Sequence, residues 1–187
     1  MKQAVLVIDM LNDFVTGELR CERADPIIPK IKTLVEEARK NEVPVVYCND
    51  AHLSVDHELK RWGPHGMKGT KGAEVIPELK PAETDYVLEK RVYSAFHGTG
   101  LDNLLGDMGV DTVIITGLHT NICDRHTAAS AFFRGYQIIV PEDAVEAFTQ
   151  KDQEEGLAYL KDVYMADVRK TADIIEEWRT QKARTKA

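Results

Sequence analysis

Cys123 is the residue of this chain with the clearest potential for chemistry. It closes the segment Val113–Cys123, in which a strand-like apolar stretch breaks at Gly117 and a helical pattern resumes near the cysteine. This arrangement predicts a thiol at the N-terminus of a helix, where unpaired backbone N–H groups favour the thiolate and so activate a nucleophile. The alternative is a packed core thiol, because cysteine is among the most buried residue types.

Three further reactive residues stand at the ends of predicted strands: Asp9, Asp50 and Lys90. Ligands of open α/β sheets bind at the carboxyl ends of the strands, so we expect these side chains near Cys123. Each alone is typical of a cap or a surface residue. Together they offer a thiol, a carboxylate to accept its proton and a cation to hold the anion, as nucleophilic acyl transfer requires. The backbone N–H groups of His119 and Cys123 could then stabilise an oxyanion.

A second group of polar residues follows Asp50 and comprises His52, Glu58 and His65. Imidazole and carboxylate ligands suit Zn²⁺ or another first-row divalent metal, so these four residues form a candidate metal site. His57 is an alternative to Glu58 as a ligand. The competing interpretation is a polar loop with solvated histidines.

Phe14 and Trp62 are the aromatic residues nearest to these two groups in sequence. Core packing is the commoner fate of such side chains. An aromatic ring three residues before a ligand histidine could also form the wall of a pocket for a flat substrate.

The elements that must position these residues follow an alternating pattern. Short apolar runs rich in β-branched residues alternate with segments of helical period, as in βαβ units. This pattern predicts an α/β class, with a three-layer, Rossmann-like, doubly wound fold built on a six-stranded, mostly parallel sheet. The predicted strands are Ala4–Asp9, Val43–Asn49, Tyr86–Lys90, Thr112–Thr116, Gln137–Pro141 and Ala166–Lys170. The predicted helices are Ile27–Arg39, Gly100–Met108, Ile122–Arg134, Gln153–Val163 and Thr171–Arg179.

Two connections, Val15–Pro26 and Asp50–Glu83, are unusually long for a compact domain and are therefore expected to carry function. The 187 residues, 43% of them hydrophobic, suit a single domain over residues 1–187, with a frayed basic tail from about residue 180.

Composition also limits the partners and the compartment. The net charge of −7 argues against nucleic acid and anionic membranes as partners. No apolar run approaches the ~20 residues of a membrane span, and we expect no signal peptide. The three cysteines show no metal-ligand spacing, which fits a reducing compartment. We therefore expect a cytoplasmic protein.

Three separated motifs give the chain a recognisable pattern: Val7–Phe14, Leu88–Phe96 and Gly117–Cys123. With them, nearly the whole chain resembles the cysteine hydrolases of the isochorismatase-like fold, which include nicotinamidase/pyrazinamidase and N-carbamoylsarcosine amidase. The resemblance implies a catalytic triad of Asp9, Lys90 and Cys123. It also implies a cis peptide before His119 that forms the oxyanion hole, and a homo-oligomer.

The nicotinamidase branch of these hydrolases binds a metal, and the resemblance places Asp50, His52 and His65 at its ligand positions, with Glu58 where a further ligand is sometimes found. Zn²⁺ is the metal expected, with Mn²⁺ or Fe²⁺ as alternatives. Phe14 and Trp62 likewise fall where that branch sandwiches a pyridine ring.

Three positions depart from the pattern of that branch. Ile122 precedes the cysteine, His119 replaces the small residue usual after the cis bond, and Gly66 stands where a cysteine is frequent. The loop from Asp50 to His65 is also shorter than in many nicotinamidases. These departures concern the substrate and leave amidase chemistry in place.

The resemblance thus implies a cysteine-dependent amidohydrolase that converts a small, nicotinamide-like carboxamide to acid and ammonia through a thioester. One alternative is an N-carbamoyl or ureido amidase, or an isochorismatase-type hydrolase, on the same fold. Another is a catalytically inert, partner-binding homologue.

Overall fold

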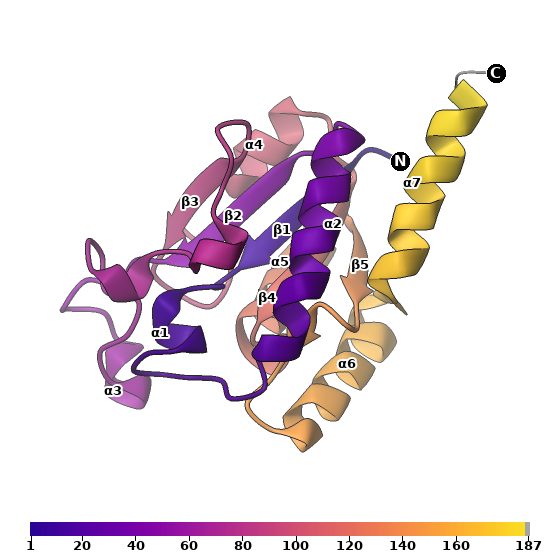
Figure 1. Cartoon of the computed structure of the whole chain (residues 1–187). Coiled ribbons are helices and arrows are strands. Elements are labelled where there is room, and N and C mark those ends of the chain that lie inside the picture. Colours follow the sequence, from indigo (N-terminus) through magenta and orange to yellow (C-terminus); the bar gives the residue numbers. More distant parts are fainter. Residues whose placement is uncertain (186–187) are drawn as a thin grey trace.

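The computed structural model describes residues 1–185, and within them a seven-stranded sheet forms the centre of the molecule (Figure 1). Its main path runs β3-β2-β1-β4-β5-β7, β6 pairs with β4, and the strand pairs are parallel. The strands are β1 (Gln3–Ile8), β2 (Val45–Asp50), β3 (Tyr86–Lys90), β4 (Thr112–Leu118), β5 (Gln137–Pro141), β6 (Val145–Glu146) and β7 (Asp167–Arg169).

The predicted three-layer α/β fold is confirmed, whereas the predicted count of six strands was one too low. The additional strand, β6, has only two residues, too few to show an alternating pattern in the sequence. It pairs with Gly117 and Leu118 of β4, which continues past the predicted break. Gly117 does not end the strand: a Cβ there would lie 2.0 Å from the carbonyl oxygen of Ile8, so glycine allows close approach to β1.

Helices cover both faces of the sheet (Figure 1). One face packs against α2 and α7, and the other against α4, α5 and α6. Two short helices, α1 and α3, lie in the connections. The helices are α1 (Asn12–Val15), α2 (Ile28–Lys40), α3 (Leu59–Trp62), α4 (Leu101–Asp107), α5 (Arg125–Phe133), α6 (Gln150–Tyr164) and α7 (Thr171–Thr185).

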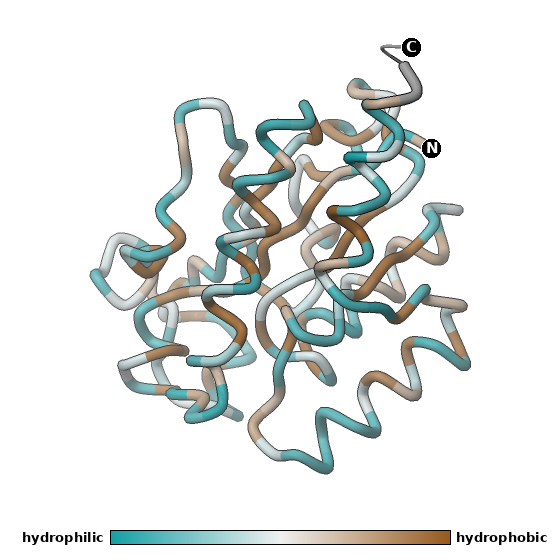
Figure 2. Tube along the Cα trace, turned by 45° about the vertical axis from the view of Figure 1, so that its right-hand side comes forward, coloured by the Kyte–Doolittle hydropathy of each residue, from teal (hydrophilic) through white to brown (hydrophobic). Residues whose placement is uncertain are grey.

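The core follows from the periodicity of the sequence. All six residues of β1 are buried, because helices cover both faces of this central strand. Helix α2 buries one stripe, Ile31, Leu34, Val35 and Ala38, at helical spacing. Figure 2 shows the result: hydrophobic colour runs through the central strands, and hydrophilic colour dominates the outer helices and loops.

The C-terminal helix differs from its prediction. Helix α7 continues to Thr185, so the tail predicted to fray from about residue 180 is helical up to that point. Contacts with α2 explain the difference: Lys182 Nζ donates to the carbonyl oxygen of Lys40 at 2.8 Å, and Arg179 pairs with Glu37 at 3.4 Å. A cation is favourable at the carbonyl end of a helix. Residues 186 and 187 of the predicted tail lie outside the described residues. Within residues 1–185, the helices are too short or too polar to span a bilayer.

The first part of the long connection after β2, which includes α3, lies at the carboxyl ends of the strands, and its later part returns to the opposite edge of the sheet, where β3 begins (Figure 1). The connection also contains two 3₁₀ turns, Lys71–Ala73 and Pro77–Leu79. An isolated bridge pairs His52 with Met67, so the segment between these two residues forms a closed loop. The first part of the predicted function-bearing loop therefore stands over the edge of the sheet where the reactive residues emerge.

Candidate active site

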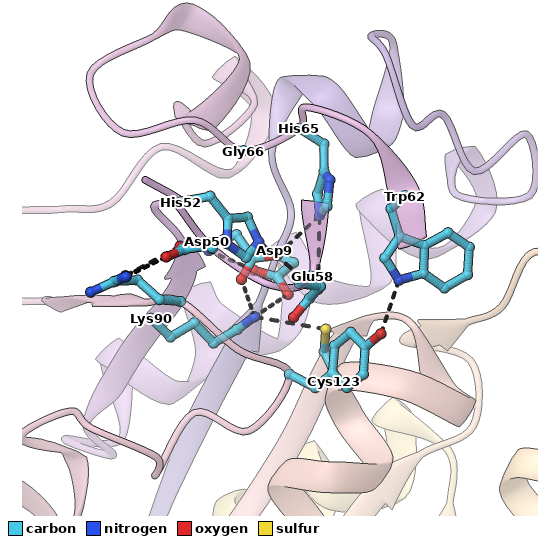
Figure 3. Close-up of polar contacts among 12 residues, drawn as sticks. Asp9, Asp50, His52, Glu58, Trp62, His65, Gly66, Lys90 and Cys123 are labelled. Atoms are coloured by element: carbon cyan, nitrogen blue, oxygen red, sulfur yellow. Dashed lines mark hydrogen bonds and ion pairs between the residues drawn. The ribbon is translucent and has the colours of Figure 1, made fainter. Parts of the chain in front are cut away.

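Strand register brings the reactive residues to one point (Figure 3). Asp50 and Lys90 are direct partners at the ends of β2 and β3. Asp9 follows the last residue of β1, which lies between β2 and β4, and Cys123 lies just beyond β4. The chain order reverses between β1 and β4, which is the switch point where open α/β sheets bind ligands.

The ammonium group of Lys90 is the centre of this cluster. Its Nζ lies 2.7 Å from Asp9 Oδ2, 2.6 Å from Asp50 Oδ1 and 3.7 Å from Cys123 Sγ. Asp9, Asp50 and Lys90 are at most 1% exposed and Cys123 is 4% exposed. Asp9 adopts a left-handed backbone conformation, φ 51°, and its Oδ1 accepts a hydrogen bond of 2.8 Å from the backbone N–H of Asp50. The contacts with Lys90 and Asp50 thus fix the position of the Asp9 carboxylate.

Burial sets the protonation states of the cluster. Burial, and next the charge of Asp50, raise the pKa of Asp9 to about 6, although Lys90 opposes the shift. Burial also raises the pKa of Cys123 well above its ordinary value. Desolvation thus opposes the thiolate that a helix N-terminus would favour, and it keeps Cys123 a thiol until a base accepts its proton. At neutral pH the site holds a thiol beside an ionised acceptor.

The turn before Cys123 has an unusual backbone. A non-proline cis peptide joins Leu118 to His119, which confirms the bond that the resemblance implied. A π-helical turn, Thr120–Asp124, follows it and leads directly into α5. The helix that was predicted to start at Ile122 begins later, at Arg125. Cys123 therefore lies in the turn that precedes the helix.

The four predicted metal ligands converge beside this cluster (Figure 3). His52 Nε2 lies 3.5 Å from Asp50 Oδ2 and 3.9 Å from Glu58 Oε1, and His65 Nε2 lies 4.0 Å and 3.9 Å from the same two oxygens. One ligand atom from each residue lies within 4.8 Å of the others. Glu58 joins this group, whereas His57, the alternative, is exposed.

The donor set fits a divalent metal. Asp50 Oδ2 and His52 Nε2 are buried and, apart from their 3.5 Å approach to each other, have no hydrogen-bond partner among residues 1–185, although such atoms normally have one. A cation bound among the four residues would satisfy both. Asp9, Asp50 and Cys123 also lie close together, but Lys90 already supplies positive charge to that group.

Outer contacts orient the two histidines. His52 Nδ1 lies 3.1 Å from Asp56 Oδ2, and Asp56 in turn accepts hydrogen bonds from Arg91, whose contact lowers the pKa of Asp56. His65 Nδ1 lies 2.8 Å from the carbonyl oxygen of Gly63. Such partners fix the orientation of each imidazole ring, so that its other nitrogen, Nε2, faces the metal site. Sequence reasoning missed Asp56; its spacing of four residues from His52 was the available signal.

A narrow pocket lies above Cys123. The predicted aromatic residues Phe14 and Trp62 both line it, with Tyr93 and Phe148, which sequence reasoning missed. Trp62 Nε1 donates to Tyr93 Oη at 2.9 Å, and Trp62 stacks on Phe148 with ring centroids 5.8 Å apart. The free volume is about 10 Å³, roughly the space of one water molecule.

Comparison with known proteins shows the wider relationship. The model of the isochorismatase domain matches residues 3–173. The chain belongs to the isochorismatase family. Nicotinamidase 3 of Arabidopsis thaliana is 36% identical over 172 residues, covering 85% of this chain and 84% of that protein.

Two solved structures extend this relationship. The N-carbamoylsarcosine amidase of Thermoplasma acidophilum is 45% identical, covers 91% of this chain and 97% of its own, and superposes with a TM-score of 0.87. The pyrazinamidase of Pyrococcus horikoshii, solved in complex with zinc, is 28% identical, covers 91% and 99%, and has a TM-score of 0.85. As an isochorismatase-family member, the chain is a hydrolase. Its relatives act on different substrates, so family membership alone does not define the substrate.

Proposed function

We propose that this isochorismatase-family hydrolase is a cysteine-dependent amidohydrolase that converts a small carboxamide to an acid and ammonia. The observation that carries the proposal is the buried cluster of Asp9, Lys90 and Cys123, with Lys90 Nζ in contact with both reactive partners. A base, a nucleophile and a stabilising cation in one desolvated place are what acyl transfer needs. An inert, partner-binding homologue has no use for a buried charge cluster, which costs free energy to desolvate.

Proton transfer starts the proposed reaction. Asp9 takes the proton of the Cys123 thiol as sulfur attacks the amide carbon, and Lys90 stabilises the negative charge that develops on sulfur. The C–N bond then breaks, Asp9 gives the proton to the leaving nitrogen, and ammonia departs. Water adds to the resulting thioester, the C–S bond breaks, and the acid leaves with the thiol restored.

The carbonyl oxygen becomes negatively charged during both addition steps. We assign its stabilisation to the backbone N–H groups of His119 and Cys123, at either end of the turn that follows the cis peptide. Donors fixed before the reaction stabilise such an oxyanion without reorganisation.

The proposed cofactor is a divalent metal, with Zn²⁺ first and Mn²⁺ or Fe²⁺ as alternatives, held by Asp50, His52, Glu58 and His65. When bound, the ion would act as a Lewis acid that orients a substrate atom or polarises a water molecule. Support comes from the donor set and its unpartnered atoms, and from the zinc-bound pyrazinamidase among the structural relatives.

Charge in the pocket bears on the substrate. Among the described residues that line it, Asp50 and Glu58 carry carboxylates, and there is no lysine or arginine. Lys90 and a bound metal would balance these two carboxylates, so the described lining of the pocket has no free cation to pair with the carboxylate of a ureido acid, whereas an uncharged, nicotinamide-like carboxamide needs none. Phe14 and Trp62 offer apolar surface to a flat ring. The pocket therefore favours an uncharged carboxamide, although the 45% identity to an N-carbamoylsarcosine amidase keeps a ureido substrate as the second candidate.

Ammonia release from a panel of small carboxamides and ureido acids tests this proposal. We expect turnover of uncharged carboxamides and little from ureido acids. Cys123→Ala should lower kcat at least about a thousandfold, since only residual binding catalysis remains. The fold and the metal content should not change.

Cys21 provides the matched control, because it is a buried cysteine that contacts the carbonyl oxygen of Ala147 outside the cluster. Cys21→Ala should keep its turnover. Substantial ammonia release by the Cys123→Ala variant would sink the cysteine mechanism, and a preference for ureido acids would favour the second candidate.

A further inference from the structure

The imidazole of His119 is a polar group in the pocket that the proposed reaction does not use. His119 lines the pocket together with Cys123, and its side chain is 3% exposed. Nε2 is buried and has no hydrogen-bond partner within the part of the chain that the structure describes. Burial lowers the pKa of His119 to about 3, so the ring is neutral at working pH. A buried nitrogen without a partner is costly unless something that enters the pocket bonds to it.

Two aromatic rings fix the plane of this imidazole. Phe148 stacks on it, with centroids 3.9 Å apart and planes inclined by 25°. Phe14 contacts it edge-on, with centroids 5.6 Å apart and planes at 81°. Stacking covers a face of the ring and leaves its nitrogen-bearing edge for polar contacts. The ring is thus held in a defined orientation, as selective recognition requires.

We propose that His119 is a specificity-determining residue, whose Nε2 forms a hydrogen bond with an uncharged polar atom in the acyl part of the substrate. The inference rests on the proposed amidase function and narrows its substrate class to carboxamides whose acyl part carries a hydrogen-bonding atom, such as a heteroaromatic nitrogen. A wholly apolar acyl part leaves Nε2 unpaired, and sites built to bond a polar group discriminate strongly against such analogues.

The neutral state of the imidazole suits an uncharged partner. A neutral imidazole donates from one nitrogen and accepts at the other, so it can match either a donor or an acceptor on the substrate. A charged partner would gain no ion pair from the neutral imidazole of His119.

Relative turnover of benzamide and the three pyridine carboxamides tests the inference, since these amides differ only in whether and where a ring nitrogen replaces a C–H group. In the unmodified enzyme, kcat/KM should favour the best pyridine carboxamide over benzamide. His119→Phe keeps a stacking ring without nitrogens, so this preference should fall about tenfold, the factor that one hydrogen bond supplies. His119→Gln, which can place an amide near the position of Nε2, should restore most of it.

Three controls keep the result interpretable. The metal ligands are unchanged in these variants, so any contribution of the metal to the preference is common to all and cancels in the ratio. His97→Phe makes the same change at an exposed histidine and should leave the ratio unchanged. If His119→Phe fails to fold, His119→Asn replaces it, because asparagine is too short to reach the position of Nε2 and should lose the preference that glutamine keeps.

Calorimetric binding of the same amides to the Cys123→Ala protein, with and without the His119 substitutions, separates the two proposals. If the unmodified enzyme shows no turnover of any amide while binding still depends on His119, the amidase function is refuted and the recognition role is retained. An unchanged preference in His119→Phe, or an equal loss for every amide including benzamide, would overturn the recognition role.

Discussion

Asp9 is the residue whose protonation should control the rate. It must be ionised to accept the thiol proton, and its pKa is raised to about 6, chiefly by burial. Activity should therefore be full above this pKa and fall as the pH drops through it. We expect kcat/KM, measured from about pH 4 to 8, to show an acid limb near pH 6, since this parameter reports the free enzyme.

Asp124 supplies a demanding control for this limb. It follows the nucleophile, is fully buried, and burial raises its pKa well above its ordinary value. If Asp9 is the titrating base, Asp124→Asn should leave the limb in place. Loss of the acid limb in Asp124→Asn would show that Asp124, and not Asp9, is the carboxyl group whose ionisation controls the rate.

Individual residues also show where sequence reasoning reached its limit. Asp9, Asp50, Lys90 and Cys123 were predictable as a group, because strand ends of a parallel sheet meet at one edge. The choice between His57 and Glu58 as a metal ligand could not be predicted, because neighbouring side chains in a loop point in different directions that only the folded backbone determines. The sequence indicated burial of Cys123, but only as an alternative to a reactive thiol; that the same cysteine is both buried and next to Lys90 depends on residues distant in sequence.

At the scale of elements, the loop after β2 works as one unit that carries the metal ligands His52, Glu58 and His65. We expect His52→Ala or His65→Ala to reduce bound metal from about one ion per chain to near zero. Asp56→Asn should weaken binding by about 10–100-fold, because Asp56 only orients His52.

His57→Ala is the matched control in that loop, because His57 is exposed and outside the ligand cluster. Metal content after dialysis against buffered zinc, determined by mass spectrometry, gives the comparison independently of activity. Equal metal loss in the His57 and His52 variants would show that the ligand set is wrong.

The main strands and helices were predictable from hydrophobic period, because central strands and amphipathic helices have distinct repeats. Strand β6 was not, since two residues carry no period. Tyr93 and Phe148 reach the pocket from connections that follow β3 and β6. Their placement depends on how those connections cross the sheet edge, which no local pattern records.

At the scale of the whole molecule, one buried cation supports both the site and the fold. Lys90→Met would leave Asp9 and Asp50 facing each other without a counter-ion in the interior. Removing one partner of a buried charge cluster costs about 3–5 kcal/mol, and each kcal/mol shifts the Tm of a domain of this size by about 2–4 °C. Thermal unfolding should show a decrease of roughly 10 °C in Tm.

Lys68 offers the same substitution on the surface. It pairs with Glu89, and the two side chains are 54% and 56% exposed. Lys68→Met should therefore change the free energy of unfolding by less than about 1 kcal/mol. A similar Tm for both variants would contradict the structural role of Lys90. The expected homo-oligomer and cytoplasmic location stay predictions at this scale.

The small free volume above Cys123 has a kinetic consequence. A carboxamide larger than this free volume must displace lining side chains as it enters, so we expect substrate capture to depend on their motion. The second-order rate constant then falls below the diffusion ceiling of about 10⁸–10⁹ M⁻¹s⁻¹ in proportion to the time the entrance stands open. Selectivity among amides would consequently include a contribution from admission, decided before any bond is broken.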